Sequence, residues 1–123
     1  MKQNKKEQEV LALNNSWNSY YYCCRNKNAN IKLHEDIIVN NKNAFYACYF
    51  AKNIKAADIE RLQEVVINRE QSWNIYWFAF YVEKSNKEEL FRALLKIGDK
   101  DHINLFIKNI PISEELKALI IFI

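Results

Sequence analysis

Glycine and proline are almost missing from this sequence, which has one of each among 123 residues. Glycine normally makes up about 7 per cent of a protein. Tight β-hairpins and Gly-rich phosphate loops need it where the backbone takes a positive φ. The scarcity excludes most such folds and predicts an all-α protein. A chain of this length allows one domain, so we expect residues 1–123 to form a single unit.

Long apolar runs and clustered charge are missing too. No window approaches the roughly 20 apolar residues of a membrane span, and Met1–Asn15 lacks the apolar stretch of a signal peptide. The odd number of cysteines (Cys23, Cys24 and Cys48) without metal-ligand spacing favours reduced thiols in the cytoplasm. The 18 basic and 15 acidic residues are interleaved, so the net charge of +3 predicts a solvated surface.

The sequence does contain an internal repeat with a period of 28 residues. Each copy has the pattern of two short helices that cannot bury their apolar stripes alone, so stacked pairs must share a core. This predicts a short right-handed α-solenoid of about four helical hairpins, with a capping helix in residues 1–15. The copies cover about 16–41, 42–70, 71–98 and 99–123. When the copies are aligned at a shift of 28 residues, each column of the alignment contains the equivalent residues of successive copies. One column contains Tyr22, Phe50, Phe78 and Phe106. Two nearby columns contain Trp17, Phe45 and Trp73 in one, and Tyr21, Tyr49, Trp77 and Leu105 in the other.

Local signals place the ends of the second helices and the core of the first. Residues whose side chains accept backbone N–H bonds precede each second helix, so we predict N-caps at Asn30, Asp58, Asn86 and Ser113. Gly98 is a predicted left-handed C-cap. Columns that stay apolar in every copy are assigned to the core on helical spacing, and they include Trp17, Phe50, Trp73, Trp77 and Phe78.

The repeat resembles HEAT- and armadillo-like helical hairpins, with units shorter than the roughly 40 residues of HEAT. It is more closely similar to short repeats of low-GC bacterial and phage proteins. Their pattern appears here as Phe50-Ala51, Ala57-Asp58-Ile59 and Leu62. The resemblance covers about Ser16–Ile123 and implies partner binding without catalysis, so it transfers no site residues.

Positions where one copy departs from the others are the candidate partner-binding residues. Aromatic residues replace more polar ones at Tyr46, Phe80, Tyr81 and Phe91, and Tyr76 is placed on the same side. Exposed aromatic rings on a rigid helix are typical binding anchors, although Phe80 and Tyr81 could instead contact the next hairpin. The charged candidates on the second helices are Glu60, Arg61, Glu64 and Arg92, which would steer association unless they form a plain solvated face.

The two histidines and the chain end suggest no chemistry. His34 stands in a leucine column, as a structural histidine or through a register slip, and His102 has no metal-ligand partner at suitable spacing. We therefore expect no enzyme, no cofactor and no metal. The apolar C-terminus either closes the core or pairs with another chain through Phe122 and Ile123.

The leading hypothesis is a non-catalytic protein-binding module. Its size suits an inhibitor or an immunity protein that neutralises a bacterial toxin or defence protein, although a net positive charge fits a basic nuclease poorly. The alternative is nucleic-acid binding, with bases stacked on aromatic rings and phosphates held by lysines. The lysines considered are Lys27, Lys32, Lys52, Lys55 and Lys108.

Overall fold

The computed structural model describes residues 15–122, and within them every regular element is a helix and no strand occurs. The prediction of an all-α protein is confirmed. The predicted capping helix at 1–15 and the contacts predicted for the side chains of Phe122 and Ile123 lie outside the described part. The elements are α2 (Ser16–Arg25), α3 (Ile31–Asn40), α4 (Ala44–Asn53), α5 (Ile59–Asn68), α6 (Ser72–Tyr81), α7 (Lys87–Ile97), α8 (Lys100–Asn109), α9 (Glu114–Lys117) and the 3-10 helix η1 (Ala118–Phe122).

The second helices of the pairs (α3, α5, α7 and α9) begin at the predicted N-cap residues, and α7 ends at the predicted C-cap. The side chains of Asn30, Asp58, Asn86 and Ser113 each accept a backbone N–H three residues further on, at 3.1–3.2 Å. Gly98 ends α7 with a φ of 79°, in the left-handed region that glycine adopts without steric cost. All five predicted caps are confirmed, because capping is a local property of the sequence.

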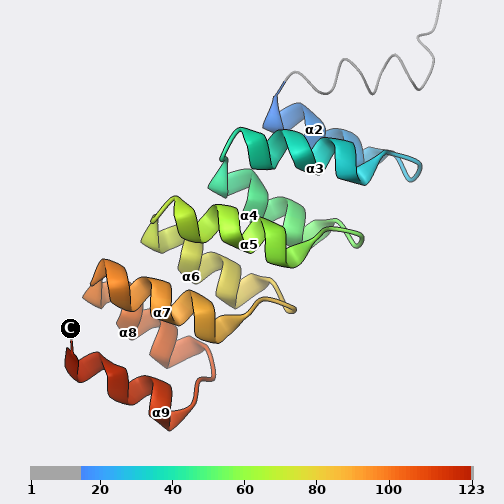
Figure 1. The fold of residues 1–123 in the computed structure, drawn as a ribbon. Coiled ribbons are helices and arrows are strands. Elements are labelled where there is room, and N and C mark those ends of the chain that lie inside the picture. The colour runs from blue at the N-terminus through green and yellow to red at the C-terminus, as the bar shows by residue number, and fades with distance from the viewer. Residues whose placement is uncertain (1–14, 123) are drawn as a thin grey trace, which may run out of the picture.

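The helices form two layers (Figure 1). The first layer contains α2, α4, α6 and α8, and each of these helices contacts the next one in the layer. The second layer contains α3, α5, α7 and α9, in front of the first layer in the view of Figure 1. Helices α2, α4 and α6 also pack on α3, α5 and α7, the helices that follow them in the chain. The core therefore lies between the layers.

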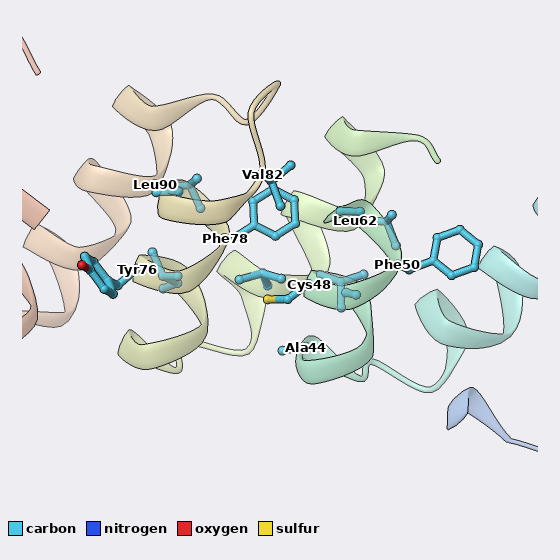
Figure 2. Close-up of a cluster of buried hydrophobic side chains, with 14 of the residues drawn as sticks. Ala44, Cys48, Phe50, Leu62, Tyr76, Phe78, Val82 and Leu90 are labelled. Carbon is cyan, nitrogen blue, oxygen red and sulfur yellow. The ribbon is translucent and has the colours of Figure 1, made fainter. Parts of the chain in front are cut away.

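Several residues 28 positions apart have the same burial in this core, although Tyr22, in the column of Phe50, is only half-buried. Phe50, Phe78 and Phe106 are fully buried on the first layer, and Leu62 and Leu90 face them from the second in one buried cluster (Figure 2). Because each copy contributes the same inward positions, successive helical pairs continue one apolar interior. The assignment of Phe50 and Phe78 to the core is confirmed.

The same assignment is wrong for two tryptophans. Trp17 and Trp73 expose 54% and 58% of their surface, and Phe45, in the same column, exposes 52%. Positions i and i+5 of an α-helix are about 140° apart around its axis. The column of Trp73 and the column of Phe78 therefore cannot both face the second layer, and α6 turns Trp73 outward.

Two buried polar residues of the second layer join each helical pair to the next. Glu35 of α3 and Gln63 of α5 occupy equivalent positions and are 4% and 3% exposed. Glu35 Oε2 accepts the backbone N–H of Asp58 at 2.9 Å. Gln63 accepts the backbone N–H of Asn86 at 2.9 Å and donates to the carbonyl of Asn86 at 3.2 Å. A buried polar side chain needs hydrogen-bond partners to offset the loss of water, and these bonds supply them across the junction between successive helical pairs.

Phe91 is the third member of this column and is fully buried. Its ring packs against Phe106 of α8 with the ring centroids 5.1 Å apart. The polar character of this column at Glu35 and Gln63 reflects an internal hydrogen bond and not solvent exposure. The prediction that Phe91 contributes to a partner-binding surface is therefore wrong.

Tyr76 is also buried, for a related reason. Its hydroxyl accepts a hydrogen bond from Asn109 Nδ2 at 3.0 Å, which joins α6 to α8. Tyr20 and Asn53 form the equivalent bond between α2 and α4 at 2.7 Å. Tyr76 is thus a structural residue of the first layer, and the prediction that it lines an exposed binding surface is wrong.

We expect the stability of the fold to fall with rising pH through Glu35. Burial raises the pKa of its carboxyl above the ordinary value of 4.5, while hydrogen bonding to Asp58 and Arg61 acts in the opposite sense. Folding therefore favours the neutral form of the Glu35 carboxyl. The stability that this preference adds is fully present below pH 4.5, and it is lost as the pH rises through the pKa of Glu35 in the folded protein. Glu35→Gln stays neutral, so raising the pH should favour the variant over the parent in urea unfolding.

The matched control is Gln63→Glu, which places a carboxylate at the equivalent buried position. The free energy of unfolding of Gln63→Glu should fall between acidic and neutral pH, because the new carboxyl becomes charged there. The uncharged Gln63 of the parent adds no such pH dependence. An identical pH dependence of the parent and Glu35→Gln would contradict the assignment.

Candidate binding surface

The outward side of the first layer carries a continuous set of aromatic side chains, which we call the aromatic face. On each helix its members occupy positions i and i+4, with two more near the end of α6, and such spacing keeps them on one side. The members are half-buried or exposed, and they are Trp17, Tyr21, Phe45, Tyr49, Trp73, Trp77, Phe80 and Tyr81. Contiguous exposed apolar patches on protein surfaces often mark interaction sites.

Ring contacts connect the aromatic face from one helix to the next. Between α2 and α4 the link runs through the buried Tyr20, which packs on Tyr21 of the face at 5.1 Å and on Tyr49 at 5.9 Å. Tyr49 in turn packs on Trp77 of α6 at 5.2 Å, and Trp77 packs on Tyr81 at 4.6 Å. Each ring is held by its neighbours, so little side-chain entropy would be lost on binding.

The charge of the aromatic face has one sign. Helices α2, α4 and α6 contain no Asp or Glu, and their cations are Arg25 and Lys52. Lys52 Nζ lies 4.6 Å from the ring centroid of Tyr81 and 5.5 Å from that of Trp77. Arg25 lies over the ring of Tyr21 at 5.6 Å. These cation–π contacts hold two positive charges among the rings.

Three predicted residues lie in or beside this surface. Phe80 and Tyr81 are 46% and 45% exposed, so the expectation of two exposed adjacent aromatic rings is confirmed. Their ring contacts are with Tyr76 and Trp77 of their own helix and with each other, and Lys52 of the neighbouring helix α4 lies over Tyr81. Tyr46 is half-buried beside the face, against Phe45.

The charged candidates lie on the opposite layer and form no common site with the aromatic residues. Glu60 and Glu64 are exposed on α5, while Arg61 is half-buried and pairs with Asp36. Arg92 of α7 pairs with Glu88 one turn earlier, at 3.1 Å, in a surface contact of little energetic weight. A hollow of about 470 Å³ between α3 and α5 is lined by Arg61 and Glu64, among others.

The sequence interpretation missed most of the aromatic face, because it took constancy among copies as proof of burial. A usable signal was present in α6, whose sequence SWNIYWFAFY is apolar around its whole circumference. Such a helix is either enclosed on all sides or presents an apolar face outward. A two-layer fold leaves one side of every helix uncovered, which selects the second case for Trp73, while Trp77 is half-buried at the edge of the core.

The titratable and nucleophilic side chains of the described residues are placed as follows. No group of three His, Cys, Asp or Glu side chains within 15–122 could hold a metal ion. His34 is buried in the column of Leu62 and stacks on Tyr22 at 5.0 Å, as a structural histidine would. Burial raises the pKa of the Cys48 thiol to about 12, so its nucleophilic form is strongly disfavoured.

Two further results bear on the setting of the surface. Within residues 15–122, no helix combines the length and the apolar character that crossing a membrane requires. Searches against family models, curated proteins and solved structures found no match to the chain. Its function must therefore be inferred from its own surface chemistry.

Proposed function

We propose that this chain is a non-catalytic helical-repeat module that binds another protein through the aromatic face. Its scaffold is a short right-handed α-solenoid of about four hairpins, with the first helices forming the binding wall. The observation that carries the proposal is the set of exposed and half-buried aromatic rings on the outward side of α2, α4 and α6, in which Trp17, Phe45 and Trp73 are more than half exposed. Tryptophan and tyrosine are the residue types that most often dominate binding energy at protein interfaces.

The charge of the face indicates the kind of protein surface that it would bind. Arg25 and Lys52 are held among the rings and no carboxylate accompanies them on α2, α4 or α6. A complementary partner is therefore apolar with acidic residues around the contact. Inhibition of a toxin or of a defence protein fits a small rigid binder of this type, and a cytoplasmic location fits its reduced thiols.

A second candidate is a single-stranded nucleic acid, and one observation favours it. The carboxylates that are interleaved in the sequence lie outside α2, α4 and α6, so the rings that could stack on bases face no acidic residue of those helices. The cations are few, however, because Lys27, Lys32 and Lys55 lie in α3 or in the turns between layers. Phosphate contacts would need a denser row of basic residues.

The test is affinity capture from the native host by three forms of the immobilised chain. We expect the parent to retain a host protein, which Phe45→Ser with Trp73→Ser fails to retain. The matched control, Glu60→Lys with Glu64→Lys, alters the second layer and should retain it. Loss of the partner in the control alone would overturn the proposed face, and capture of nucleic acid in place of protein would favour the second candidate.

A further inference from the structure

The two layers leave several surfaces that could carry a second role. The hollow between α3 and α5 contains cations, but Arg61 is already paired with Asp36 and Glu35. A smaller hollow at the C-terminal end is lined by Ile103 and Ile120 and has no distinctive chemistry. The aromatic face alone combines exposed rings, fixed cations and a regular spacing, and this spacing has a consequence for the partner.

Equivalent residues of neighbouring first-layer helices lie side by side. Cys48 of α4 contacts the carbonyl of Asn74 in α6 at 3.6 Å, and the rings of Tyr49 and Trp77, 28 positions apart, lie 5.2 Å apart, so α4 and α6 run in the same direction. Packed helices are about 8–10 Å apart from axis to axis. An α-helix rises about 1.5 Å per residue, so about five to seven residues of a helix laid across the layer span one step between hairpins. Of these spacings, seven residues bring a side chain back to nearly the same side of the helix, with a drift of about 20° per heptad.

The two edges of the face differ in chemistry. Near the N-terminal ends of the helices lie Trp17, Phe45 and Trp73, which are the most exposed of the rings. The last turns of α2, α4 and α8 carry Arg25, Lys52 and Lys108. The last turn of α6 breaks this series, because it carries no basic residue and ends in Phe80 and Tyr81.

We infer that the natural partner segment is an acidic amphipathic helix laid across α2, α4, α6 and α8, with one heptad per hairpin. Its apolar stripe covers the row of Tyr21, Tyr49 and Trp77. Its flank toward the helix C-terminal ends carries carboxylates opposite Arg25, Lys52 and Lys108, and one large apolar residue opposite Phe80. This inference deepens the proposed protein-binding function and rests on it.

The order of groups along the partner follows from the order of the hairpins. Three carboxylates and one apolar residue are needed at heptad spacing, in the sequence acidic, acidic, apolar, acidic. Repetition of one heptad would leave a carboxylate opposite the ring of Phe80, where α6 supplies no cation of its own to compensate its desolvation. The interrupted charge row therefore selects the register in which the helix binds.

The test uses three synthetic amphipathic peptides of four heptads with the full chain. The first carries the flank order acidic, acidic, apolar, acidic. The second has lysine in place of each acidic residue, and the third exchanges the apolar position with the second acidic one. All three tryptophans of the chain (Trp17, Trp73 and Trp77) belong to the aromatic face, so intrinsic fluorescence reports binding there directly.

We expect the first peptide to bind at least about tenfold more tightly than either of the others, as removal of one well-placed contact commonly costs. Lys52→Glu should reverse the preference between the first two peptides. Equal binding of all three peptides, or no binding of the first, would overturn the helix inference. Stronger binding of a single-stranded oligonucleotide than of the first peptide would also overturn it.

The outcome can be separated from that of the proposed function. If the host protein still depends on Phe45 and Trp73 for capture while the first peptide fails to bind, only the helical form of the partner is wrong. If capture of the host protein is unaffected by those substitutions, the aromatic face itself is not the binding surface.

Discussion

Replacing Phe80 and Tyr81 together by alanine should abolish capture of the partner while leaving the fold intact. The two rings are adjacent and nearly half exposed, and Tyr81 holds Lys52 in place. Truncation of one aromatic anchor at an interface commonly costs 2 kcal/mol or more, which is about a 30-fold loss of affinity. We therefore expect the double variant to bind its partner at least about 30-fold more weakly, as measured by calorimetry with the captured protein.

The fold of this variant should be retained, because neither ring belongs to the buried cluster. Loss of the exposed ring contacts should cost less than about 2 kcal/mol of unfolding free energy. Far-ultraviolet circular dichroism is the control, and it should show unchanged helicity. Unchanged affinity with an intact fold would exclude Phe80 and Tyr81 from the interface, and collapse of the fold would place them in the core.

Phe78→Ala should have the opposite profile, with a large loss of stability. Phe78 is fully buried in the cluster that contains Leu62 and Leu90 (Figure 2). Truncation of a buried phenylalanine costs about 3–5 kcal/mol, because the cavity that remains is only partly refilled. Domains of this size are stable by only about 5–15 kcal/mol. We expect the midpoint of thermal unfolding to fall by roughly 10–20 °C.

Phe80→Ala is the matched control, since it removes the same ring two positions further along α6. Its thermal midpoint should stay within a few degrees of the parent, because the ring is 46% exposed. Phe50→Ala should resemble Phe78→Ala, since the two occupy equivalent buried positions 28 residues apart. Equal destabilisation at positions 78 and 80 would contradict the two-sided structure of α6.

The sequence supports some features of the candidate site and conceals others. Phe80 and Tyr81 could be predicted because they alone are aromatic in columns that are otherwise mostly polar. The exposure of Trp17 and Trp73 could not be predicted by comparing copies. An aromatic residue that is repeated on the outward side of each copy has the same sequence pattern as one that is repeated in the core. Exceptions to a repeat are therefore visible in a single sequence, whereas a surface that is itself repeated is not.

Tyr76 and Phe91 show the reverse error. The column of Phe91 contains polar residues in other copies, which suggests solvent, and Tyr76 is assigned to the same side as the exposed candidates. The structure instead places both residues at junctions between successive pairs, where Tyr76 bonds Asn109 and Phe91 packs on Phe106. A polar residue that bonds across a junction has the same signature in one sequence as a polar residue in water.

The sequence by itself determined the helical character of the chain, the period of 28 residues and the caps that begin and end the second helices. These features depend on backbone preferences and on hydrogen bonds within a few residues, so they can be derived from neighbouring positions alone. The tertiary structure decided which side of each first helix is covered. That choice depends on helices distant in the sequence, and it turns one set of aromatic residues into a core and the other into a surface.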